Sequence, residues 1–193
     1  MQAFLITFFI VFSALAATAQ DSTRIKELER RVKTLETRVA RSNQSSEAKK
    51  MSEIAHERDA KDMEKFSRED LARAEQMYQR ANRNLADERS KDILDSVVAL
   101  YPQFNRAGCA QLYRAQRDHG SEKERLLIDC INRFSDCFYM DGTQVGPLAM
   151  LYLAAHYQRT DREADARRLI KRLKKECRDA VGHDGKLLVD KLP

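Results

Sequence analysis

Residues 24–39 repeat apolar side chains at alternating spacings of three and four, which is the pattern of a two-heptad coiled coil. The apolar residues, at the a and d positions, are Ile25, Leu28, Val32, Leu35 and Val39. The flanking charges are Arg24, Arg31 and Arg38 at g, and Glu29 and Glu36 at e. In a parallel assembly each g residue faces the next e residue of its neighbour, so arginine meets glutamate, whereas an antiparallel dimer sets like charges together. The segment therefore predicts parallel self-association.

The number of helices in this assembly is open between three and two. Residues 24–29 and 31–36 both follow the order Arg-h-x-x-h-Glu, where h is apolar, which resembles a short trimerisation motif. β-Branched residues at a with leucine at d favour two helices instead. We expect a trimer, with a dimer as the alternative. A third interpretation is a single amphipathic helix that packs on the protein itself, because coiled coils usually run for three or four heptads.

The first 19 residues have the features of a signal peptide. They carry no charged side chain, and residues 4–15 form an almost unbroken apolar run. The run ends in Ala17-Thr18-Ala19, a small-x-small sequence that predicts cleavage before Gln20. An uncleaved signal anchor is the alternative, although the run is short for a bilayer span. We therefore expect a periplasmic or secreted protein without stable membrane insertion after cleavage.

Composition favours an all-α fold. The chain has only 6 glycines and 3 prolines, and charged residues make up 34% of it. The densest basic stretch, residues 167–175, places Leu169, Ile170 and Leu173 at helical spacing and contains no aromatic residue for stacking on bases. We interpret this stretch as the solvated face of a helix, and we expect no nucleic-acid partner.

From Phe66 onward, paired amphipathic helices recur with a period of about 35 residues, which is typical of helical-hairpin solenoids. The recurring Leu/Met-Tyr pairs and the alanines that follow them are Met77-Tyr78 with Ala81, Leu112-Tyr113 with Ala115, and Leu151-Tyr152 with Ala154. The prediction is an oligomerisation segment at 20–41, a linker or exposed helix at 42–65, and a repeat domain at 66–193. A generic helical bundle is the alternative.

The last hairpin resembles a tetratricopeptide repeat. The residues in the order and spacing of that repeat are Met150, Leu153, Ala154, Tyr157, Ala166, Ile170 and Leu173. A signal peptide, a coiled coil and tetratricopeptide-like repeats, in that order, resemble the periplasmic Tol-Pal-associated family. The resemblance implies an oligomeric scaffold that binds envelope proteins or peptides and acts in envelope constriction at cell division.

All the cysteines lie in the predicted repeat domain. They are Cys109, Cys130, Cys137 and Cys177. Export favours disulfides, and Cys109 and Cys130 stand about ten residues either side of a helix–helix turn. We therefore predict the disulfides Cys109–Cys130 and Cys137–Cys177. Four buried free thiols are the alternative.

The sequence contains no pattern of a catalytic site. It lacks a Gly-rich phosphate loop, paired metal-ligand spacing and a recognisable nucleophile, so we expect no enzymatic activity, no cofactor and no metal. An adaptor is the favoured function, with a structural envelope spacer or a thiol-redox protein as alternatives. On helix-face reasoning, the candidate partner-binding groove consists of Gln76, Gln79, Arg80, Gln111, Arg114 and His156.

Overall fold

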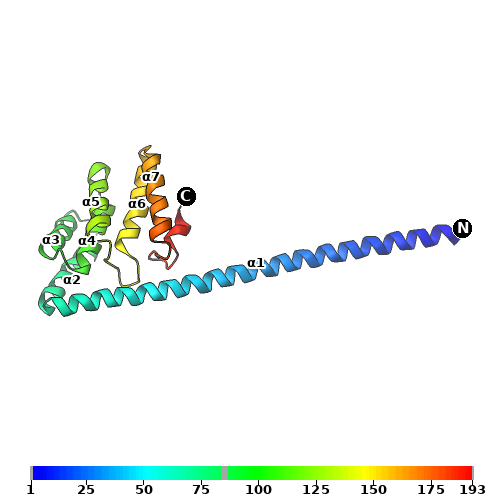
Figure 1. Cartoon of the computed structure of the whole chain (residues 1–193), viewed down its shortest axis with the longest axis horizontal. Helices are drawn as coiled ribbons and strands as arrows, with labels where there is room; N and C mark the ends of the chain where they lie inside the picture. Colours follow the sequence, from blue (N-terminus) through cyan, green and yellow to red (C-terminus); the bar gives the residue numbers. More distant parts are fainter. Residues whose placement is uncertain (1, 84–86, 193) are drawn as a thin grey trace. The chain divides into compact units, whose positions relative to one another are not determined.

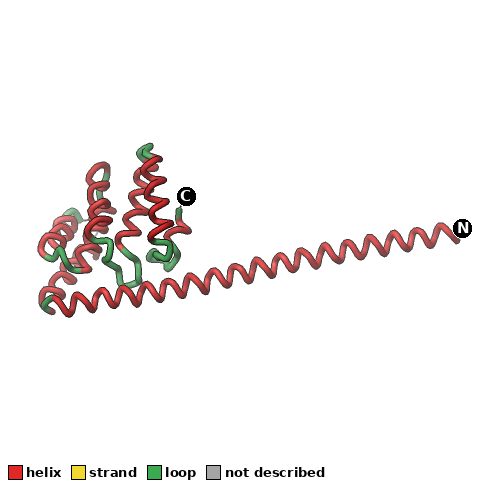
Figure 2. Tube along the Cα trace, in the orientation of Figure 1, coloured by secondary structure: helices red, strands yellow, loops and turns green. Residues whose placement is uncertain are grey.

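The computed structural model describes the backbone of residues 2–83 and 87–192; the side chains of residues 1–23, 25, 36 and 38–45 lie outside the description. Within the described residues the chain is helical and has no strand, which confirms the all-α prediction (Figure 2). The helices are α1 Gln2–Lys65, α2 Arg68–Arg83, α3 Arg89–Leu100, α4 Asn105–Arg117, α5 Gly120–Arg133, α6 Val145–Arg159, α7 Glu163–Glu176 and the short 3-10 helix η1 Leu188–Lys191 (Figure 1).

The chain divides into two compact units. Residues 1–43 form the first unit, and residues 44–193 form the second. The described part of the first unit is a single helical segment stabilised by local contacts. Arg30 pairs with Glu27 across one turn at 3.1 Å, and the Thr34 hydroxyl donates to the carbonyl of Arg30.

In the second unit, the helices α2 to α7 pack as successive hairpins. Each helix contacts the next along the chain, and α4 also contacts both α2 and α6. The core is built from fully buried leucines, among them Leu94, Leu112, Leu127 and Leu173. Small residues allow the helices to approach closely. The buried alanines of these helices are Ala74, Ala81, Ala107, Ala110, Ala115, Ala149, Ala154 and Ala166.

Residues 44–65 of α1 are a packed helix rather than a linker or a fully exposed helix. One face is buried in the second unit through Met51, Ala55 and Asp62. The sequence pattern understates this packing, because one methionine and one alanine supply its buried apolar contacts and charged residues surround them. This part of α1 crosses the connections that join one hairpin to the next (Figure 1).

The connection between α5 and α6 and the segment that follows α7 are copies of one loop. Residues 136–145 and 179–188 both contain an Asp-Gly pair, with the glycine in the left-handed region and the aspartate side chain accepting a hydrogen bond from the amide two residues on. In the first loop, the backbone amides of Tyr139, Gly142 and Val145 donate to the carbonyls of Thr143, Tyr139 and Cys137, respectively. At the equivalent places in the second loop, the amides of Gly182, Gly185 and Leu188 donate to the carbonyls of Lys186, Gly182 and Ala180. The same loop therefore precedes both α6 and η1.

Both loops pack on α1. Phe138 from the first loop and Val181 from the second form a small apolar cluster with Met51 and Ala55. Glycine permits the close approach in the first loop, because a Cβ at Gly142 would lie 2.6 Å from the backbone nitrogen of Ser52 in α1. The second loop lies further away, since a Cβ at Gly185 would lie 3.6 Å from the Cβ of Ala48.

A buried polar network connects α1 to the start of α4. The Asp62 carboxylate accepts a hydrogen bond from the backbone amide of Asn105 at 2.6 Å, and it pairs with Arg58 in the preceding turn of α1. Asn105 in turn bonds the backbone of Phe138 in both directions, at 2.9 Å and 2.6 Å. Asp62 therefore satisfies a donor at the N-terminus of α4 from outside that helix, as helix ends require.

A hydrogen bond also joins the two loops to each other. The Nδ1 atom of His183 lies 2.7 Å from a carboxylate oxygen of Asp141, and the histidine ring stands edge-on to Tyr139. Burial raises the pKa of Asp141, but hydrogen bonds from His183 and Thr143 outweigh it and hold the pKa at about 2. Asp141 is therefore ionised over the whole neutral range.

The predicted disulfides are wrong, because all four cysteines are free thiols. Cys109 donates to the Phe138 carbonyl at 3.3 Å, in the loop after α5, instead of pairing with Cys130. Cys137 packs against Gly108, where an added Cβ would lie 2.6 Å from the Cys137 Sγ. Cys109 and Cys130 were predicted to lie at the same height in a hairpin, but a disulfide also requires the two side chains to converge, and these do not.

Candidate interaction surfaces

The first candidate surface is an exposed apolar stripe on α1. Leu28, Val32 and Leu35 follow one helix face, and they are 52%, 53% and 58% exposed. Single exposed apolar side chains are common on protein surfaces, whereas a contiguous group of them marks a surface that another molecule covers. Arg24, Arg31 and Glu29 are exposed beside the stripe. The remaining predicted seam residues, whose side chains lie outside the description, are Ile25, Val39, Glu36 and Arg38.

The predicted partner-binding groove is only partly accessible. Gln76 and Arg80 are exposed on α2, and Gln79 donates to Glu75 in its own helix at 2.7 Å. The other three residues take part in packing: Gln111 donates to Asp129, Arg114 pairs with Asp95 and Asp118, and His156 is buried. Gln111 and Arg114 thus bind α5 and α3, and His156 is buried, so these three do not form an open surface with the α2 residues.

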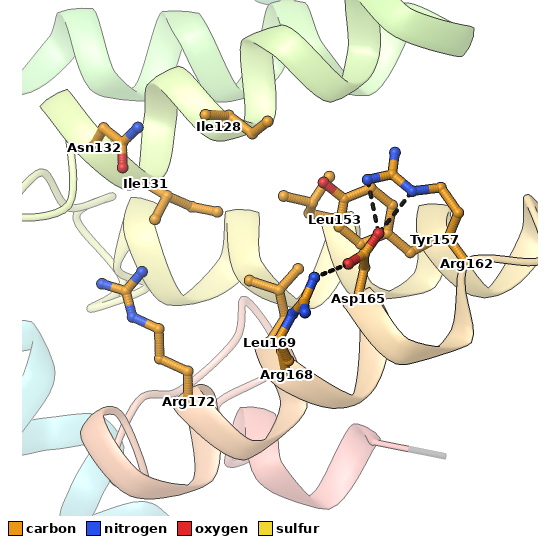
Figure 3. Close-up of a pocket in the computed structure, with 10 residues that line it drawn as sticks. All are labelled: Ile128, Ile131, Asn132, Leu153, Tyr157, Arg162, Asp165, Arg168, Leu169 and Arg172. Carbon is orange, nitrogen blue, oxygen red and sulfur yellow. Dashed lines mark hydrogen bonds and ion pairs between the residues drawn. The ribbon is translucent and has the colours of Figure 1, made fainter.

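A second candidate surface is a cleft of about 370 Å³ between α5 and α7, with α6 beneath it (Figure 3). Its floor contains the buried Ile131 and Leu153, and its walls carry Ile128 and Leu169. Ile128 is 38% exposed, although its neighbours Leu126 and Leu127 are buried. The groove predicted from the sequence consists of residues of α2, α4 and α6, so it does not include this cleft between α5 and α7. The available signal was Ile128, an apolar residue beside the buried stripe of α5.

Arg162 lies at one end of the cleft and binds side chains from the helices around it. Its guanidinium lies 2.8 Å from Glu124 in α5. It also lies 2.8 Å from Asp165 in α7 and stacks 4.0 Å above the ring of Tyr157 in α6 (Figure 3). The Tyr157 hydroxyl also donates to Glu124 at 2.8 Å. The hydrogen bond from Arg162 lowers the pKa of Glu124, so this carboxylate stays charged. Arg162 thereby connects α5, α6 and α7 at this end of the cleft.

The α7 wall of the cleft is basic. Between residues 163 and 176 it carries six basic and three acidic side chains, a net charge of +3. Arg168 pairs with Asp165, and Arg172 pairs with Glu176 at 2.8 Å; both arginines line the cleft. Leu173 is buried while the basic residues of 167–175 are exposed, as the helical spacing predicted.

The thiols have the properties of core residues. Burial raises the pKa of Cys109 and of Cys137 to about 12, and it raises the pKa of Cys130 as well. The thiolate is the reactive form of cysteine, so these side chains are unreactive at neutral pH. In the part of the chain that the structure describes, no group of three or more His, Cys, Asp or Glu side chains is arranged to hold a metal ion.

The leader predicted at residues 1–19 falls among side chains outside the description, so it stays a prediction. Within the described residues, no helix is both long enough and apolar enough to cross a bilayer. Comparison with protein-family models finds no match to this chain, and searches of curated proteins and of solved structures find none either.

Proposed function

We propose that the protein is an exported oligomeric adaptor, in which α1 joins several copies and the helical hairpins bind protein partners of the cell envelope. The observation that carries the proposal is the exposed line of Leu28, Val32 and Leu35 on α1. Full burial of such a side chain contributes about 1.5–3 kcal/mol, and each is already half covered. Covering the rest of all three contributes a few kcal/mol per chain, which self-association would gain.

The hairpin body fits the adaptor half of the proposal as a tetratricopeptide-like solenoid. The first helices of successive hairpins contact one another, and Ala154 and Ala166 are buried where the last hairpin closes. Such rows of hairpins present extended surfaces to partner chains. The resemblance to the Tol-Pal-associated family suggests a role in envelope constriction at cell division. The raised thiol pKa values disfavour the thiol-redox alternative.

The assembly is tested by replacing Leu28 and Leu35 together with Asp. We expect the wild-type protein to sediment as a trimer, or as a dimer in the alternative, and the double variant to sediment as a monomer, because a charge in the seam loses apolar burial. Leu100→Asp is the matched control, since Leu100 is 63% exposed outside the seam. A monomeric wild type, or an unchanged oligomer in the double variant, would refute the proposal.

Export is tested separately by mass measurement of the protein from fractionated cells. Cleavage before Gln20 and recovery outside the cytoplasm are the expected results. Recovery of the intact chain from the cytoplasm would contradict export while leaving the oligomer intact.

A further inference from the structure

The cleft between α5 and α7 is open and apolar at its base, although the hairpin core around it is closed. It has a volume of about 370 Å³, within the range of pockets that hold ligands. Ile128 stays 38% exposed at its wall, and Leu153 closes its floor. An occupant that inserts apolar side chains here would cover Ile128 and displace water from the base of the cleft.

The charges around the cleft select the kind of occupant. The α5 wall is balanced, with three basic and three acidic side chains, whereas α7 carries a net charge of +3. On α7, Lys171 is exposed and has no ion-pair partner among the described residues. Arg168 and Arg172 reach toward the cleft from the same helix (Figure 3). A segment with carboxylates along the side that faces α7 would therefore complement this wall.

The shape of the cleft favours a helical occupant. Two helices form its walls and a third forms its floor, which is the arrangement in which an amphipathic helix places its apolar face in a groove. We propose that the cleft between α5 and α7 binds an amphipathic helix of a partner protein that is apolar on its inner face and acidic on its flank. This inference rests on the adaptor function and names the partner's chemistry.

The test uses a synthetic peptide and the full chain. The peptide is a labelled helix of about four turns with leucines at i, i+3, i+4 and i+7 and glutamates on the flank. A second peptide replaces every glutamate with lysine. By fluorescence anisotropy, we expect the acidic peptide to bind with an affinity that falls as salt is added, and the basic peptide to bind at least about tenfold more weakly.

Variants place the binding in the cleft. Ile128→Asp, and Arg168→Glu combined with Arg172→Glu, should each weaken binding of the acidic peptide about tenfold or more. The matched control, Lys174→Glu combined with Lys175→Glu, changes the charge of α7 equally but lies outside the cleft lining, and it should weaken binding less than about threefold. Circular dichroism confirms that each variant is folded.

Three results would overturn the proposal: no binding of the acidic peptide, equal losses in the control and the cleft variants, or binding that survives Ile128→Asp. Vesicles containing phosphatidylglycerol provide a further comparison. Tighter binding to vesicles, independent of Ile128, would make α7 a membrane-surface helix instead. The seam variant Leu28→Asp with Leu35→Asp should bind the peptide with unchanged affinity per chain, so failure of self-association and failure of this inference are separate results.

Discussion

Replacing either loop glycine with alanine should separate the cost of a left-handed backbone conformation from the steric cost of an added Cβ. Gly142 and Gly185 occupy equivalent places in the two copies of the loop, at φ +89° and +70°. A left-handed conformation costs an alanine about 1–2 kcal/mol, and the stiffer unfolded chain offsets part of that cost. Gly185→Ala meets only ordinary contact with Ala48, so we expect a loss of about 1 kcal/mol.

Gly142→Ala adds a steric cost. Its Cβ would lie 2.6 Å from the backbone nitrogen of Ser52, and a helix backbone cannot move aside as a flexible side chain does. Helix α1 would have to shift away from the loop, which uncovers Met51 and part of Phe138. Burial of one such side chain contributes about 1.5–3 kcal/mol, so we expect a total loss of about 3–5 kcal/mol.

The assay is urea unfolding followed by circular dichroism, with hydrogen exchange of residues 44–62 as the local measurement. We expect Gly142→Ala to lower the free energy of unfolding by at least about 2 kcal/mol more than Gly185→Ala, and to increase exchange in this part of α1. Equal losses in the two variants, or unchanged exchange in α1, would show that α1 does not pack against the first loop as described.

Three further outcomes are expected. Asp62→Ala should lower the free energy of unfolding by about 2–4 kcal/mol in the urea assay, because the buried backbone amide of Asn105 and the guanidinium of Arg58 lose their acceptor. A loss below about 1 kcal/mol would contradict the network. The pKa of Asp141 is about 2 when folded and higher when unfolded, so its pairing with His183 stabilises the protein above about pH 4 and is lost as the pH falls toward 2. Both side chains are nearly half exposed, so His183→Ala should remove about 1 kcal/mol or less of this acid-dependent stability, measured by thermal unfolding from pH 2 to 7. In the native protein at pH 8, iodoacetamide should label the half-buried Cys177 first and the other three cysteines only after unfolding; peptides joined by a disulfide would contradict free thiols.

Helix content followed from the sequence because amphipathic periodicity is a local property. The apolar positions of α5 and α7 recur at helical spacing, and Leu127 and Leu173 are buried as that spacing requires. Residues 44–65 were harder to interpret, because apolar residues such as Met51 and Ala55 are few in this segment and charged residues are many. Their burial depends on partners more than 80 residues further along the chain, which periodicity does not contain.

The loops and cysteines show a second limit of sequence reasoning. The two Asp-Gly loops share a backbone, but Phe138 corresponds to Val181 and Tyr139 to Gly182, so side-chain similarity is low. Counting residues from a turn predicts that Cys109 and Cys130 lie at the same height in the hairpin. The count carries no information about the direction of each side chain, so it could not predict whether the two sulfur atoms meet. The cleft between α5 and α7 likewise depends on how the hairpins pack, and its Arg162–Glu124 pair joins residues distant in sequence.

The attachment of α1 along the hairpin row has a mechanical consequence. Residues 51–62 are attached at successive connections, by Met51 at Phe138 and Val181, by Arg58 at Gln103, and by Asp62 at the start of α4. A pulling force along the axis of this segment loads these attachments together, in shear, so rupture requires them to fail at nearly the same extension. A force perpendicular to the axis would instead peel them away one after another. The segment therefore resists tension far better in one direction than in the other.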